Sequence, residues 1–205
     1  MRVFTGGLSF QRECLDAHNL ERKRHGCPPL HWAQDLVDLA VKWAENLAHK
    51  GRVAFLDLEG VGENIRFFTA SDSSHLPTGL EVTELWANEE EHFDYNHPKW
   101  QTMNKVADCQ SFSQLIWKNS REFGASRCWV KEANRVVVVA LYRPAGNTKL
   151  HGGFAHNVPR IVTATPSKRS LLAAKRGSTT QELWHEPDDM HMRIMIDKLS
   201  IKEND

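Results

Sequence analysis

The stretch RVVVVALY, residues 135–142, decides the fold class of this 205-residue chain. Its run of β-branched and aliphatic side chains is typical of a strand that is covered on both faces. Residues 125–131 predict a second strand, and residues 132–134 predict a short hairpin link between the two. We therefore expect two adjacent strands to finish the folded domain.

The residues that precede these strands predict helices. Over residues 34–50, large apolar side chains recur at helical spacing on one face. Residues 9–25, 79–93 and 112–118 predict three more helices. Between residues 52 and 78 the periodicity fades, and Gly, Ser and Pro residues predict loops. Helices first and strands last are compatible with an α+β class, although periodicity alone leaves the topology open.

Some single residues also carry expectations. The charged run at residues 21–24 is expected to lie in water, and His18 is expected to be a hydrogen-bonded structural histidine. Asn64 is expected to hold a backbone turn. Trp32, Trp100 and Trp129 are candidates for exposed aromatic residues, which need no functional explanation when they occur singly.

Composition divides the chain into three segments. Residues 1–8 predict an N-terminal arm, residues 9–160 the folded domain, and residues 161–205 a polar tail that is mostly disordered. The first part of the tail is basic and could rest on an anionic bilayer. This candidate membrane patch combines basic and apolar side chains: Lys168, Arg169, Leu171, Leu172, Lys175 and Arg176.

Charge and hydropathy exclude several classes of partner. The chain has 26 basic and 26 acidic residues, so it lacks the long-range field that attracts nucleic acid. Its longest apolar run is far shorter than the ~20 residues of a transmembrane helix, and no signal peptide is recognisable. We therefore expect a cytoplasmic protein, with export by an unconventional route as the alternative.

The four cysteines lack metal-ligand spacing and are expected to be reduced, although their number permits two disulfides.

Six short stretches follow one another in an order and spacing typical of one family. They are AHNLER (17–22), HGCPPL (25–30), GEN (62–64), ELW (84–86), FSQLIWKNS (112–120) and YRPAGN (142–147). Over residues 9–158 the chain resembles the CAP superfamily, which includes cysteine-rich secretory proteins, insect antigen 5 and plant pathogenesis-related proteins of group 1. It is similar to the Golgi-associated branch, and also to the venom-allergen-like proteins of parasitic worms. The resemblance implies a three-layer α–β–α sandwich with a small, largely antiparallel sheet, and a peripheral location on Golgi or other membranes.

The resemblance also implies a cleft lined by two histidines and two glutamates that can hold a divalent metal. Glu63 and Glu89 match the two acids, but Ser111 stands where one histidine is expected, and the position of the other also lacks one. An oxygen-only set is poor for zinc and at best weak for calcium or magnesium, so we predict no cofactor and no metal-dependent hydrolase. Ser111 is expected to be a hydrogen-bonding pocket residue. As an alternative, three other histidines are candidates to rebuild a metal site: His75, His92 and His97.

Two functions from different classes remain open. The resemblance implies binding of lipid or sterol, and Ile65, Phe67 and Phe68 form a candidate apolar lipid loop beside the cleft. Inward packing of Phe67 and Phe68 is the simpler explanation of the same pattern. The alternative function is a protein-interaction module, such as a homodimer, whose pocket is vestigial.

Overall fold

A computed structural model describes residues 3–5, 7–98 and 109–162 of the chain. The chain divides into two units, Met1–Thr165 and Pro166–Asp205, and the second unit lies outside the described residues. The candidate membrane patch of the tail and Trp100 also lie outside them. In the described part, no helix combines the length and the hydropathy needed to cross a bilayer.

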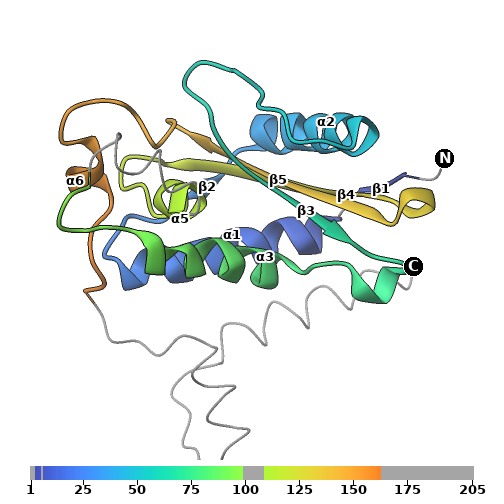
Figure 1. Cartoon of the computed structure of the whole chain (residues 1–205), viewed down its shortest axis with the longest axis horizontal. Helices are drawn as coiled ribbons and strands as arrows, with labels where there is room; N and C mark the ends of the chain where they lie inside the picture. The colour runs from blue at the N-terminus through green and yellow to red at the C-terminus, as the bar shows by residue number, and fades with distance from the viewer. Residues whose placement is uncertain (1–2, 6, 99–108, 163–205) are drawn as a thin grey trace, which may run out of the picture. The chain divides into compact units, whose positions relative to one another are not determined.

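A five-stranded sheet forms the middle layer of the domain (Figure 1). Strand β5 (Arg135–Arg143) lies between β4 (Glu122–Val130) and β3 (Gly62–Thr69) and pairs antiparallel with both. Two short strands, β1 (Val3–Thr5) and β2 (His31–Trp32), pair with β4, antiparallel and parallel respectively. The valine-rich segment of β5 is buried on both faces, as its sequence predicts.

Helix α2 (Gln34–Lys50) covers one face of the sheet. Its apolar stripe packs against β4 and β5, and Gly51 ends it in the left-handed conformation at φ 68°. The helix lies so close to β4 that a Cβ atom at Gly124 would collide with the backbone of Leu36 and Val37. The prediction of a helix over residues 34–50 is confirmed, because its periodicity reports a face that the fold buries.

Three helices cover the opposite face. They are α1 (Leu8–Arg24), α3 (Gly79–Ala87) and α5 (Gln110–Leu115). Helix α3 begins with a capping box in which Thr78 and Glu81 bond each other's backbone N–H groups. Among the described residues, the other short helices are η1 (Ser73–His75), η2 (Asn88–His92), η4 (Lys131–Ala133) and α6 (Gly153–Asn157). The three layers confirm the predicted α–β–α sandwich.

The prediction of loops over residues 52–78 is wrong for β3. Ile65, Phe67 and Phe68 belong to this strand, and their register partners on β5 are Val139, Val137 and Val136. Ile65 and Phe67 pack on the α2 side, and Phe68 packs on the other face. The candidate lipid loop is therefore an edge strand with alternating orientation, because successive side chains of a strand point to opposite faces.

Arg22 corrects another expectation, since it lies in the core rather than in water. Its guanidinium donates hydrogen bonds of 2.8–3.0 Å to the carbonyl oxygens of Pro28, Leu115, Trp117 and Ser120. Burial lowers its pKa to about 10, so the side chain remains charged at neutral pH. Arg22 thus ties α1 to the loop after it and to the segment that follows α5.

Smaller corrections concern element ends and a tryptophan. The predicted helix over residues 79–93 ends as an α-helix at Ala87 and continues as η2, and the one over residues 112–118 is α5. Trp129 is 7% exposed and donates a hydrogen bond to the carbonyl oxygen of Ala70, so the expectation that it is exposed is wrong. The four cysteines are buried as free thiols.

Candidate functional site

The carboxylate of Glu89 on η2 caps the first turn of α5. Its Oε2 accepts hydrogen bonds from the backbone N–H groups of Ser111 (2.9 Å) and Phe112 (3.2 Å), donors that a helix leaves unpaired at its start. The guanidinium of Arg66 on β3 lies 3.8 Å from Oε1. Burial raises the pKa of Glu89, and the bonds from Phe112 and Ser111 and the charge of Arg66 oppose that shift. Glu89 and Ser111 are therefore neighbours, as the resemblance implies.

Asn64 connects the corner formed by Glu89, Ser111 and Arg66 to a buried chain of hydrogen bonds. Its amide donates to the carbonyl oxygen of Ser111 at 2.9 Å and to the phenolic oxygen of Tyr142 at 3.0 Å. The Tyr142 hydroxyl lies 2.8 Å from Nε2 of His18, whose Nδ1 lies 2.7 Å from the carbonyl oxygen of Cys14. A carbonyl only accepts, so Nδ1 carries the proton and Nε2 accepts from Tyr142. The structural role predicted for His18 is confirmed, whereas Asn64 bridges two elements instead of holding a turn.

Glu63 lies on the other side of β3. Its Oε1 accepts a hydrogen bond of 2.7 Å from the backbone N–H of Leu56, and the side chains two and four residues further along the strand pack toward α2. Burial raises its pKa, opposed by Leu56 and by the side chain of Trp43. Because Asn64 and Arg66 face Ser111 and Glu89, alternation along β3 separates Glu63 from Glu89. The structure thus brings together two of the three predicted cleft residues.

The metal that the family resemblance implies does not fit these residues. Neither Glu63 nor Glu89 has a histidine among its hydrogen-bond or ion-pair partners in the described chain, and each carboxylate is engaged by backbone N–H groups. Of the histidines considered as replacements, His92 lies 3.3 Å from Glu91 and His97 lies 3.1 Å from Asp94. The side chain of His75 is outside the described part.

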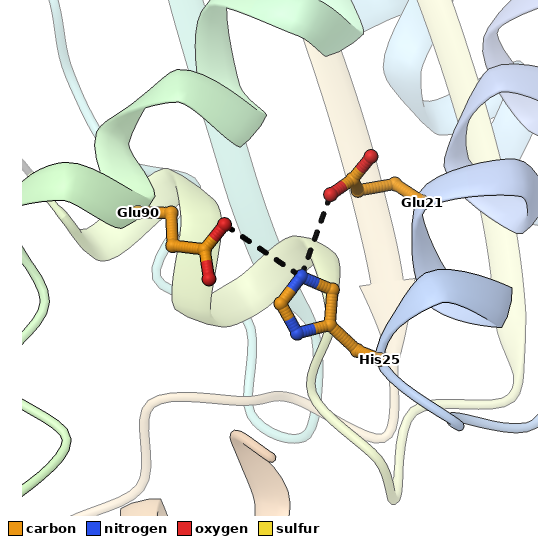
Figure 2. Close-up of side chains that lie close together, drawn as sticks. All are labelled: Glu21, His25 and Glu90. Carbon is orange, nitrogen blue, oxygen red and sulfur yellow. Dashed lines mark ion pairs between the residues drawn. The ribbon is translucent and has the colours of Figure 1, made fainter. Parts of the chain in front are cut away.

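A different polar cluster, which the sequence analysis missed, lies between α1 and η2 (Figure 2). Nε2 of His25, just after α1, lies 3.4 Å from Oε1 of Glu21 and 3.9 Å from Oε2 of Glu90. Although burial alone would raise the pKa of Glu21, the neighbouring side chains of His25 and Arg24 hold it below its usual value. The four-residue spacing of Glu21 and His25 is visible in the sequence. Glu90 joins them only in the folded chain, where η2 lies close to the end of α1.

Comparison with known proteins agrees with this architecture. The chain is 31% identical over 153 residues to human Golgi-associated plant pathogenesis-related protein 1, an alignment that covers 73% of this chain and 92% of the human protein. It is 28% identical to pathogenesis-related protein 1A of Nicotiana tabacum over 67% of this chain and 76% of that protein. The solved structure of BmVAL-1 superposes with a TM-score of 0.55 at 16% identity, over 70% of this chain and 80% of that one.

A protein-family model also matches the chain over the region of the sequence motifs. It is described as CAP, the cysteine-rich secretory protein family, and it matches residues 15–142. That range begins in α1, includes the Glu89–Ser111 corner and ends at Tyr142 on β5. The chain therefore belongs to the CAP, or cysteine-rich secretory protein, family.

Proposed function

We propose that this CAP protein is a non-enzymatic lipid-binding protein that attaches to membranes through the apolar loop, which we define as residues 51–61 between α2 and β3. Three large apolar side chains of this loop are exposed: Val53 by 52%, Phe55 by 69% and Leu58 by 48%. Figure 1 shows the segment running back along α2 from its C-terminal end and arching away from the sheet before it enters β3. This concentration of exposed apolar surface on one short segment carries the proposal.

Hydrogen bonds and apolar contacts fix the conformation of the apolar loop. Glu63 accepts from Leu56 N–H, and the Gly60 carbonyl accepts from the backbone N–H of Ala145 at 2.8 Å. Ala54, Leu56 and Val61 point inward and pack on the α2 side of the sheet, next to Ile65 and Phe67. A loop anchored from below presents its outer side chains at little entropic cost, which favours insertion among acyl chains or around a sterol.

The described polar groups support binding rather than catalysis. Ser111 contacts Glu89 through its backbone N–H and its side chain, but a carboxylate is a poor activator of an alcohol. His18 is neutral and buried, and its two nitrogens are occupied by Cys14 and Tyr142. The buried hydrogen bonds of this corner therefore join α1, β3, β5 and α5 and serve the fold.

Membrane charge enters the proposal through the basic tail patch. Within the apolar loop and its start, Lys50 and Arg52 are offset by Asp57 and Glu59, so the loop itself has no strong preference for anionic lipid. The tail residues between Lys168 and Arg176 carry four cationic side chains, each worth about 1 kcal/mol near an anionic surface. Similarity to a Golgi-associated human protein supports a peripheral location on an intracellular membrane, and export to the cell exterior is the alternative.

Co-sedimentation of the full chain with liposomes tests the proposal. Vesicles of neutral phospholipid, of neutral phospholipid with sterol, and with anionic lipid separate the apolar contribution from the charged one. We expect binding to all three, strongest with anionic lipid and reduced by salt. Absence of binding to every composition would contradict the proposal and favour the protein-interaction module, which self-association measured by sedimentation velocity would then report.

A further inference from the structure

We propose that Glu21, His25 and Glu90 bind one zinc ion, at a site separate from Glu63 and Glu89. The side chain of His25 is 0% exposed, and its Nε2 is a buried nitrogen without a hydrogen-bond partner among the described residues. This nitrogen points between the carboxylates of Glu21 and Glu90 (Figure 2). A buried, unpaired imidazole nitrogen that faces two carboxylates is an unusual and costly arrangement unless a cation or a proton joins them.

The tautomer of His25 favours a metal. Nδ1 lies 2.8 Å from the carbonyl oxygen of Pro159, and because a carbonyl only accepts, Nδ1 must carry a proton. In the neutral ring, Nε2 then presents its lone pair to the two glutamates. A backbone carbonyl that fixes Nδ1–H while Nε2 binds the metal is the usual outer-shell arrangement of a zinc-binding histidine.

The distances and donor types suit zinc. Bonds of about 2.0–2.2 Å in tetrahedral geometry place neighbouring ligand atoms roughly 3.4 Å apart. The separations here are 3.4 Å from Nε2 to Glu21 and 3.9 Å to Glu90, and the three ligand atoms lie within 4.8 Å of one another. One imidazole and two carboxylates leave a fourth position for water. Magnesium and calcium need more oxygen ligands than this cluster offers.

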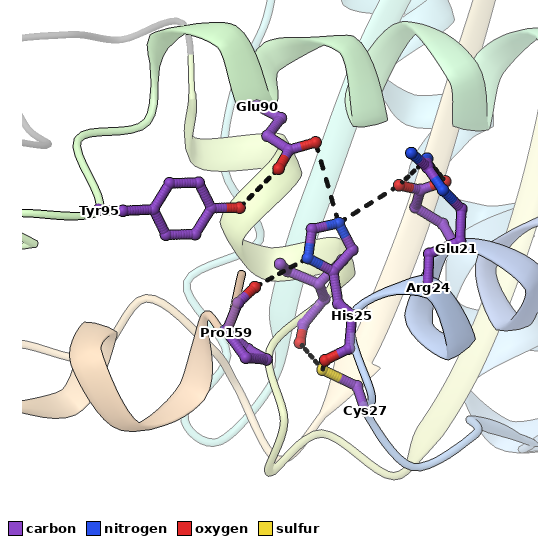
Figure 3. Close-up of polar contacts among 8 residues, drawn as sticks. Glu21, Arg24, His25, Cys27, Glu90, Tyr95 and Pro159 are labelled. Carbon is purple, nitrogen blue, oxygen red and sulfur yellow. Dashed lines mark hydrogen bonds and ion pairs between the residues drawn. The ribbon is translucent and has the colours of Figure 1, made fainter. Parts of the chain in front are cut away.

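Neighbouring groups hold both carboxylates in place (Figure 3). Tyr95 donates a hydrogen bond of 2.7 Å to Oε1 of Glu90, which leaves Oε2 directed at His25. Arg24 donates to both oxygens of Glu21 at 2.6 and 2.7 Å. With both glutamates ionised, Arg24 offsets one of two negative charges, so the cluster keeps a net charge that favours a dication. The Glu90 side chain is 26% exposed, so a zinc ion can reach the cluster from solvent on the side of Glu90.

A bound zinc ion would link the end of α1 to η2, and through His25 to the segment at Pro159. The test is isothermal titration of the chelator-stripped full chain with zinc chloride, together with the zinc-induced rise of the melting temperature. We expect one zinc per chain in the wild type. Glu90→Gln should weaken binding at least tenfold, because it removes a ligand charge and keeps an oxygen for Tyr95. His25→Asn should abolish binding while its amide still donates toward Pro159, and circular dichroism checks that it folds.

Matched controls separate this site from other zinc-binding groups. Glu91→Gln changes an exposed neighbour of Glu90, and Glu63→Gln and Glu89→Gln change the family positions; all three should bind zinc as the wild type does. Zinc binding that Glu90→Gln leaves unchanged would mean an adventitious surface site and overturn the proposal. So would loss of binding in Glu63→Gln, or a wild type that binds no zinc because a proton on His25 joins the carboxylates.

Discussion

Nε2 of His18 lies 2.8 Å from the hydroxyl of Tyr142, and this hydrogen bond fixes α1 to the central strand β5. Burial lowers the pKa of His18 to about 3, from a usual 6.5. Between these values the unfolded chain binds a proton that the folded chain does not, so this group makes stability fall as the pH falls. The loss starts near pH 6.5 and continues toward pH 3.

The consequence is a measurable pH dependence of unfolding. From pH 6 to pH 5 we expect His18 to lower the free energy of unfolding by about 1 kcal/mol. Glu63 and Glu89, whose pKa values are raised, act in the opposite direction and are common to wild type and variant. Urea titrations at pH 7, 6 and 5 should therefore give a shallower acid-side decline for His18→Gln. Equal declines in both proteins would contradict the assignment.

Arg22 should be a centre of stability. Replacing it with methionine removes the donors for the carbonyls of Leu115, Trp117 and Ser120 and leaves those acceptors buried. We expect Arg22→Met to lower the free energy of unfolding by about 3–5 kcal/mol, measured by urea denaturation. The adjacent, exposed Lys23 is the control, and Lys23→Met should change it by less than about 0.5 kcal/mol. A variant of Arg22 as stable as that control would refute the role.

The contact between α2 and β4 makes Gly124 intolerant of a side chain. A Cβ there would meet backbone atoms of Leu36 and Val37, which cannot rotate away. Gly124→Ala should destabilise the fold by about 1–3 kcal/mol, seen as a lower melting temperature. Gly7→Ser is the comparison, because nothing lies within 4 Å of a Cβ at Gly7 and serine suits the N-cap of α1. An unchanged melting temperature for Gly124→Ala would show that the two layers can separate.

The domain should fold without its tail. A chain that ends at Thr165 keeps the whole first unit, including the hydrogen bond of 2.9 Å from Val162 N–H to the Arg24 carbonyl. We expect one cooperative thermal transition within a few degrees of that of the full chain, followed by circular dichroism. A broad or absent transition would show that residues beyond Thr165 belong to the core.

The sequence was most informative where structure is local. The helix Gln34–Lys50 and the strand Arg135–Arg143 were predicted because their side-chain patterns report burial that extends over one element. Strand β3 was missed because it is an edge strand: Glu63, Arg66 and Thr69 interrupt its apolar character, and only the pairing with β5 reveals it.

The functional residues depended still more on distant contacts. In the sequence Arg22 is part of a charged run that is expected to lie in water, whereas in the fold it donates to the carbonyls of Leu115, Trp117 and Ser120. Glu63 and Glu89 were paired by family resemblance, but alternation along β3 separates them. Glu90 approaches His25 only because the fold brings η2 close to the end of α1. None of these contacts has a signature in local spacing.

Lipid contact through the apolar loop is tested directly by comparing two variants. Phe55→Asp and Leu150→Asp each place a charge at an exposed apolar side chain, 69% and 74% exposed, but only Phe55 lies in the loop. Burying most of a phenylalanine contributes about 1.5 kcal/mol, roughly tenfold in partitioning. In co-sedimentation with sterol-containing neutral liposomes, Phe55→Asp should bind at least tenfold more weakly than wild type, and Leu150→Asp should match it. Equal binding by Phe55→Asp and wild type would contradict the account.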